Sequence, residues 1–273
     1  MSSVSDHILD AVAGGAYHAP HDVLGLHQEG DGSWVIRARR PIARTVTAIT
    51  GDGTEIPLTH ERSGIWEGQA ATPPAAYDLV ATYDGAPDYR ADDPYRHLPT
   101  IGETDLHLIG EGRHEELWRA LGAHVRRYGA VSGVSFAVWA PNARAVRVTG
   151  DFNSWDGASH AMRSLGGSGV WELFVPGLGA GTAYKYEILT AHSDWILKAD
   201  PMASWAEVPP ATASVVTESS YEWADAEWLE ARATHTPLDQ PMSTYELHLG
   251  SWRPGLGYRD AADPLIDYLT ELG

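Results

Sequence analysis

Residues 134–155 read VSFAVWAPNARAVRVTGDFNSW, and this stretch decides the fold class. Apolar residues alternate with small or polar ones in VSFAV and again in AVRV, on either side of a Pro-Asn turn. An apolar residue at every second position is typical of a β-strand that buries one face. The segment GDFNSW that follows is a turn signal. The stretch therefore predicts two short antiparallel strands and a turn, which are units of a β-sandwich.

An internal duplication extends this prediction to the first half of the chain. WVIRARRP, ending at Pro41, resembles FAVWAP, ending at Pro141, and SGIWEG around Trp66 resembles SGVWEL around Trp171. YDLVATYDG likewise resembles YKYEILTAH, and the offset grows from 100 to 105 to 107 residues along the chain. Loop insertions in a copied domain produce such a drift. The equivalent places of the two tryptophans predict that both pack inside their modules.

The expected fold is mainly β, with two immunoglobulin-like antiparallel β-sandwich modules followed by the first β/α unit of an incomplete (β/α)8 barrel. The expected parts are a first module over residues 1–104 with a short leading helix, a helical linker at 105–126, a second module over 127–220, a connection at 221–242 and the barrel unit at 243–273.

Two of these parts carry specific expectations. In the linker, RHEELWRALGA predicts a helix with Leu117, Trp118 and Leu121 on one face. In the last part, YELHL is expected as a strand, and DPLIDYLTELG as a helix with Asp263 at the N-cap and Pro264 at the first helical position. Here the chain is expected to be truncated, since the later barrel strands do not follow.

Composition excludes several classes of function. The chain has 273 residues, a formal net charge of −18 and no cysteine, so disulfides and thiolate metal sites are excluded. An acidic surface disfavours nucleic acid and anionic membranes as partners. No apolar run approaches the ~20 residues of a membrane helix, and the N-terminus lacks the features of a secretory signal. These features predict a cytoplasmic protein without a membrane or nucleic-acid partner.

The choice of aromatic residues points to carbohydrate. Eleven Trp and twelve Tyr stand against three Phe. Trp and Tyr combine a flat apolar face with a polar edge, which suits stacking on sugar rings. Most of the tryptophans are nevertheless expected in the sandwich cores.

Four motifs in this order resemble bacterial glycogen (1,4-alpha-glucan) branching enzymes. GDFNSWDG resembles the signature of glycogen- and starch-binding modules that precede the barrels of the alpha-amylase superfamily. DLHLIGEGRHEELWRALGAH resembles the linker of branching enzymes, YELHLGSW their first barrel strand, and HAPHDVLGLH the opening of the long bacterial form with an extra N-terminal module. The resemblance covers nearly the whole chain.

The resemblance implies an enzyme that cuts alpha-1,4-glucan and re-attaches the segment through an alpha-1,6 bond, by a retaining mechanism with two carboxylates. In this family those carboxylates follow later barrel strands, which are absent here, so no catalytic residue is assigned and the chain is expected to be inactive alone. The expected partner is alpha-1,4-glucan or glycogen, and the second module is expected to pack on the barrel in the full protein. No cofactor is implied.

The resemblance also implies glucan-binding residues in the second module. Trp155, Lys185 and Trp195 match positions that bind glucan in relatives, and Asn153 belongs to the same turn as Trp155. The residues themselves leave alternatives open. The Trp155 indole stacks on glucose or packs on the sandwich edge, and Lys185 is a hydroxyl donor or an ordinary solvated lysine. Trp195 follows a polar turn and suits stacking.

Two further alternatives were weighed. His18, His21 and His27 are clustered, but without a carboxylate pattern, so pairing with backbone carbonyls or carboxylates is expected rather than a metal site. The alternative functions are a stand-alone glucan-binding module and the front end of a debranching or trehalose-releasing relative. The YELHL segment argues against the first, and the duplicated module and linker motif against the second.

Overall fold

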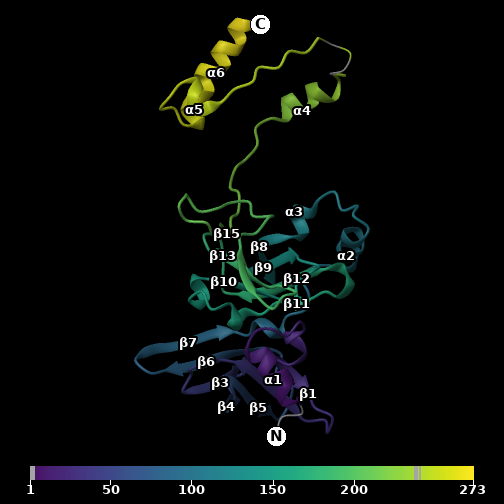
Figure 1. Cartoon of the computed structure of the whole chain (residues 1–273), viewed down its shortest axis with the longest axis vertical. Coiled ribbons are helices and arrows are strands. Elements are labelled where there is room, and N and C mark those ends of the chain that lie inside the picture. The colour runs from purple at the N-terminus through teal and green to yellow at the C-terminus, as the bar shows by residue number, and fades with distance from the viewer. Residues whose placement is uncertain (1–3, 237–238, 240) are drawn as a thin grey trace. The chain divides into compact units, whose positions relative to one another are not determined.

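The computed structural model describes residues 4–236, 239 and 241–273 (Figure 1). The chain divides into two compact units, Met1–Ser219 and Ser220–Gly273. The first unit contains both β-modules, and the second contains helices. Among the described residues, no helix has the length and apolarity needed to cross a membrane.

The first module is one antiparallel sheet in the order β1-β2-β5-β4-β3-β6-β7. Its elements are the leading helix α1 (Asp6–Ala13) and the strands β1 (Gly25–Gln28), β2 (Trp34–Arg39), β3 (Thr45–Thr50), β4 (Glu55–Arg62), β5 (Ile65–Ala70), β6 (Tyr77–Tyr83) and β7 (Ala86–Asp92). Strand β4 pairs with β5 on one side and β3 on the other, with a register shift after His60. Buried side chains from strands β2 to β6 form a single core cluster, so the module is sandwich-like although its sheet is continuous.

The second module consists of two antiparallel sheets, β10-β13-β14 with β15 beside β13, and β11-β12-β9-β8. Its strands are β8 (Gly122–Tyr128), β9 (Val131–Trp139), β10 (Ala145–Gly150), β11 (Arg163–Ser164), β12 (Val170–Pro176), β13 (Ala183–Leu189), β14 (Trp195–Lys198) and β15 (Ser214–Val215). The expectation of a mainly β chain with antiparallel, sandwich-like modules is confirmed.

The duplication seen in the sequence reappears as matched tryptophan hydrogen bonds. The Trp66 indole N–H donates to the Arg40 carbonyl at 2.9 Å, and the Trp171 indole N–H to the Ala140 carbonyl at 3.1 Å. Each acceptor precedes the proline that ends its motif. Both tryptophans are buried, as predicted.

A matched tyrosine–aspartate pair completes the common frame of the two modules. The hydroxyl of Tyr77 donates to Asp93 at 2.7 Å, and the hydroxyl of Tyr184 to Asp200 at 2.6 Å. Burial raises the pKa of both carboxyl groups above the ordinary aspartate range, although the tyrosine hydrogen bonds act in the opposite direction. The two modules therefore share a hydrogen-bonded frame as well as a sequence pattern.

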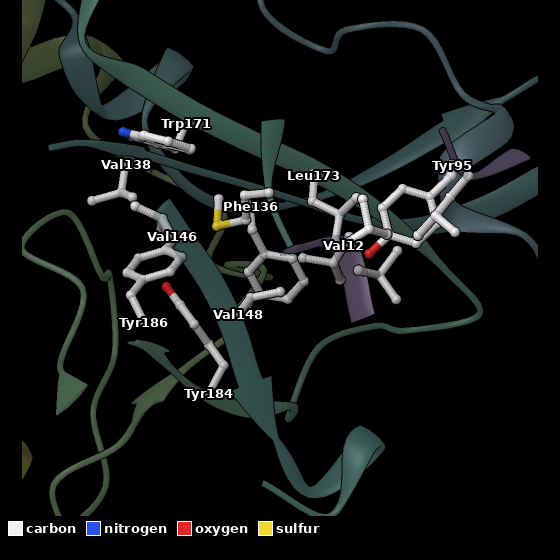
Figure 2. Packing of buried hydrophobic residues seen from close by; sticks show 14 of the residues in the cluster. Val12, Tyr95, Phe136, Val138, Val146, Val148, Trp171, Leu173, Tyr184 and Tyr186 are labelled. Atoms are coloured by element: carbon white, nitrogen blue, oxygen red, sulfur yellow. The ribbon is translucent and has the colours of Figure 1, made fainter. Parts of the chain in front are cut away.

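The two modules also share one apolar core. Val12 of α1 and Tyr95 of the first module lie in the same buried cluster as Phe136 and Leu173 of the second, as Figure 2 shows. Polar contacts surround this junction: the Arg39 side chain donates to the Ala13 carbonyl at 2.7 Å and to the Ser159 hydroxyl at 2.8 Å. The sequence patterns predicted two modules, each with its own core, and gave no sign of this shared one.

The segment between the modules differs from the predicted long helix. It forms α2 (Glu103–Gly110) and a single turn α3 (Leu117–Ala120), and β8 begins at Gly122. The helix ends because Leu121 is extended and Gly122 has φ of 102°, a conformation that glycine adopts without strain. Leu121 is buried against the second module, whereas Trp118 is 57% exposed, so the three residues do not share one buried face.

The second unit contains α4 (Ala226–Ala233), α5 (Leu249–Trp252) and α6 (Tyr258–Leu272). The prediction of a strand at residues 245–249 is wrong, and no β/α barrel unit forms among the described residues. A strand needs a hydrogen-bonding neighbour, and the described part of this unit has none to offer. The last helix begins five residues before Asp263, so Pro264 lies inside it rather than at its first position.

Candidate functional site

The turn after β10 holds the tryptophan of the GDFNSW motif in a fixed orientation. Ser154 and Trp155 have φ of 54° and 59°, in the left-handed region that non-glycine residues rarely adopt. The Trp155 backbone N–H donates to the Gly150 carbonyl at 2.9 Å, and its indole N–H donates to the Asp151 carboxylate at 2.8 Å. The indole is 39% exposed. The turn thus presents part of a flat aromatic surface to solvent while its polar edge is bound.

Asn153 builds this turn from inside. Its amide oxygen accepts from the Gly150 N–H, and its amide nitrogen donates to the Val148 carbonyl, both at 3.0 Å. The same nitrogen lies 3.0 Å from Nδ1 of His160. Burial, together with the charges of Arg40 and Arg39, lowers the pKa of His160 to about 3, so its imidazole is neutral at pH 7 and can accept this hydrogen bond.

Lys185 lies on β13, in register with Thr149 of β10. Tyr184 and Tyr186, on either side of it, are buried in the core, so Lys185 points to the outer face as expected from the alternation. Its ammonium group donates to the Thr212 hydroxyl at 2.6 Å. Thr212 comes from the irregular segment before β15, and no pattern in the sequence indicated that it would meet Lys185.

Trp195 begins β14, in register with Leu189 of β13. The Arg147 guanidinium lies 3.4 Å from the centre of its ring, within cation–π range. Arg147 in turn donates to the carbonyls of Gly14 and Gly15 after α1 and pairs with Glu187. One face of the Trp195 ring is therefore covered by an arginine that the N-terminal segment holds in place.

The predicted residues form two groups on the sheet β10-β13-β14. Trp155 is bonded to Gly150, whose strand partner Tyr184 precedes Lys185. Trp195 stands opposite Leu189, four residues further along β13 than Lys185, which is roughly 13 Å at about 3.3 Å per residue. The structure places Trp155, Asn153 and Lys185 at one end of the sheet and Trp195 at the other.

The remaining candidate sites are less developed. An apolar cavity of about 370 Å³, lined by Leu117, Trp139 and Met202 among others, contains none of the four predicted residues. Within the described ranges, no group of three or more His, Asp or Glu side chains is arranged to hold a metal ion. In the histidine cluster, His27 contacts the Leu24 carbonyl at 2.9 Å, a contact of the kind expected from the sequence.

Comparison with known families assigns both modules. Residues 120–203 match the family described as Carbohydrate-binding module 48 (Isoamylase N-terminal domain), so the second module belongs to a class of carbohydrate-binding domains. Residues 5–95 match the family described as alpha-1,4-glucan branching enzyme GlgB, N-terminal domain. With these two domains in this order, the chain corresponds to the N-terminal part of the bacterial 1,4-alpha-glucan branching enzyme GlgB.

Curated relatives agree with this assignment over nearly the whole chain. A 1,4-alpha-glucan branching enzyme GlgB of Leifsonia xyli is 55% identical over 100% of this chain and 38% of its own length. The enzyme of the same name from Thermobifida fusca is 54% identical over 97% of this chain and 36% of its own length. The chain thus spans little more than a third of these relatives. A solved pullulanase of Klebsiella pneumoniae is only 15% identical, with a TM-score of 0.32 over 71% of this chain and 24% of its own, and carries no argument.

Proposed function

We propose that this chain is a non-catalytic region of a glycogen-branching enzyme and that its second module binds alpha-1,4-glucan on the outer face of β10-β13-β14. The enzyme would cut alpha-1,4-glucan and re-attach the segment by an alpha-1,6 bond in the cytoplasm. The match to a carbohydrate-binding module supports the ligand class. The observation that carries the proposal is the exposed Trp155 indole, held by its N–H on Asp151.

Each residue of this face receives a distinct role in the proposal. Trp155 stacks on a glucose ring, because its exposed surface is flat and apolar while its polar edge is already bound. Lys185 and Thr212 offer donors and acceptors to the sugar hydroxyls at the same end of the sheet. Asn153 is a positioning residue, because its amide is committed to the turn.

Trp195 is proposed as a second stacking residue with a single free face. The Arg147 guanidinium covers the other side of its ring and fixes its orientation. A ring fixed before binding loses less rotamer freedom when ligand arrives, which favours affinity. Because the two ends of the sheet are roughly 13 Å apart, a ligand touching both tryptophans has to be an oligosaccharide rather than a single sugar.

Three further elements belong to the same proposal. The two modules are immunoglobulin-like, the second module packs on the catalytic barrel in the full protein, and the chain alone has no branching activity. Each follows from the branching-enzyme assignment, and each concerns the whole protein, of which relatives extend well beyond the region matched here.

Binding of maltoheptaose, measured by isothermal titration calorimetry, tests the proposed face. Trp155→Ala is expected to weaken binding on the order of tenfold, which corresponds to ~1.4 kcal/mol. Trp195→Ala is expected to weaken it less, because one face of that ring is already covered. Trp66→Ala serves as the control, since that residue is buried in the first module and its loss acts on stability. Unchanged binding in both surface variants would contradict the proposed face.

A further inference from the structure

A groove of about 440 Å³ lies between the first module and the GDFNSW turn of the second. Its volume falls within the range of small-molecule sites, about 300–1,000 Å³. The lining residues used below are Arg40, Tyr83 and Tyr89 of the first module and Asn153, Ser154 and His160 of the second. Trp155 does not belong to the lining, so the groove is separate from the face proposed above.

Arg40 gives the groove hydrogen-bond donors that the protein itself leaves unused. Its Nη1 donates to the Arg39 carbonyl at 2.8 Å, and its Nε is buried with no hydrogen-bond partner among the residues that the structure describes. An unsatisfied buried donor is unfavourable, and each such group in a native protein calls for an explanation. A ligand that brings oxygen atoms to this guanidinium is one such explanation.

The charges around the groove balance, which favours a neutral ligand. Of the charged residues that line it, Arg39 and Arg40 are positive and Asp92 and Asp156 are negative. Asp156 lies 3.7 Å from Arg39, and Asp92 pairs with Arg96 outside the lining. His160 adds no charge at neutral pH, since burial lowers its pKa to about 3. A phosphate or carboxylate ligand would meet two carboxylates as well as the arginines.

The rim of the groove is aromatic and locally strained. Tyr89 on β7 is 47% exposed, and Tyr83 on the neighbouring strand β6 is half-buried. Ile42 is 91% exposed and has φ of 56°, an outlier for a β-branched residue. Neither strain nor exposure benefits an isolated isoleucine, and strained residues concentrate at functional sites. Apolar and aromatic surface beside free donors is the composition that a sugar requires.

We propose that this groove binds a second stretch of α-glucan, with Tyr89 stacking on a sugar ring and Arg40 donating to sugar hydroxyls. The proposal rests on the proposed glucan-binding function and adds a site that includes the first module. A glucan polymer that occupies both the groove and the Trp155 face gains avidity, because the second contact becomes intramolecular.

The test compares three variants of the full chain, Tyr89→Ala, Trp155→Ala and the double variant, by affinity electrophoresis in glycogen gels and by calorimetry with maltoheptaose. Tyr128→Ala is a matched control, since Tyr128 is 40% exposed in the same unit and does not line the groove. Tyr89→Phe retains the ring and is expected to bind like the parent. Thermal unfolding of every variant establishes that the fold is retained.

Two sites predict that each single variant lowers apparent affinity for glycogen on the order of tenfold and that the double variant loses more than either. If Trp155→Ala weakens binding but Tyr89→Ala behaves like Tyr128→Ala, the groove is not a glucan site although the proposed function stands. If Trp155→Ala has no effect, the proposed face fails independently of the groove. Titration with inorganic phosphate that is lost in Tyr89→Ala or Arg40→Gln, without a matching loss of maltoheptaose binding, would overturn the choice of ligand.

Discussion

Protonation of His21 is expected to destabilise the first unit as the pH falls below neutrality. The residue lies between the two modules' shared core and the N-terminal segment, with its ring 5.1 Å from that of Tyr95. Both ring nitrogens are buried without a hydrogen-bond partner among the described residues. Burial is the main cause that lowers the pKa of His21 to about 2, and the positive charge of Arg163 adds to it.

The size of the effect follows from the linkage between protonation and folding. The folded-state pKa lies below the ordinary value of 6.5, so the fold favours the neutral ring. The stabilisation is fully present above pH 6.5 and is lost as the pH falls below that value, where only the unfolded chain binds the proton. Between pH 7.5 and pH 5.5 the loss amounts to about 1.4 kcal/mol, and it does not depend on how far below 5.5 the folded pKa lies.

Urea denaturation of the parent and of His21→Phe at both pH values measures this contribution. The larger phenyl ring and the removal of two unsatisfied nitrogens shift the absolute stability in opposite directions. The informative quantity is therefore the change between pH 7.5 and 5.5, which should be smaller in the variant by about 1.4 kcal/mol. His160, whose pKa is also lowered, to about 3, titrates equally in both proteins and cancels. His192→Phe, at an exposed histidine, is the control. An equal fall in stability for the parent and for His21→Phe would refute the argument.

Three further outcomes are expected. Trp171→Ala should lower the free energy of unfolding by about 3–5 kcal/mol in urea, because the residue is buried and its N–H is bound to Ala140; a loss below 1 kcal/mol would contradict its place in the core. Backbone amides of α6 should exchange with deuterium faster than those of β9, because Ile266, Leu269 and Leu272 remain exposed; equal protection would show that this helix has a stable partner. Amylose incubated with the chain should keep its iodine absorption spectrum, and a clear shift would disprove the expected inactivity.

The strands could be predicted from the sequence because each carries its own evidence. Val134, Phe136 and Val138 all point into the core, so the period of two survives in three dimensions. The duplication was visible because its hydrogen-bonded frame depends on particular side chains, such as Trp66 and Trp171.

Contacts between distant segments could not be predicted in this way. Nothing in the pattern around Val12 distinguishes a helix that packs on its own module from one that enters the neighbour's core. The apolar alternation of YELHL predicted a strand, but alternation describes a side-chain pattern and supplies no hydrogen-bonding partner.

The candidate site divides along the same line. That Lys185 faces outward followed from alternation, whereas its partner Thr212 lies in a segment without regular structure. Asn153 belonged to the right turn, but only the geometry shows its amide bonded inward to Gly150 and Val148. A family signature indicates which residues gather at a turn, and the structure shows which of them still have free atoms to offer.

The shared core has a practical consequence for any attempt to transplant the sugar-binding module. A cut at residue 120, where the family match begins, would remove Val12 and Tyr95 from the cluster around Leu173 and expose that apolar surface to water. It would also take away Thr100, whose hydroxyl and backbone N–H both donate to the buried Glu172. In evolutionary terms, two copies that began as interchangeable cassettes have become welded, and the smallest portable piece is the whole of Met1–Ser219.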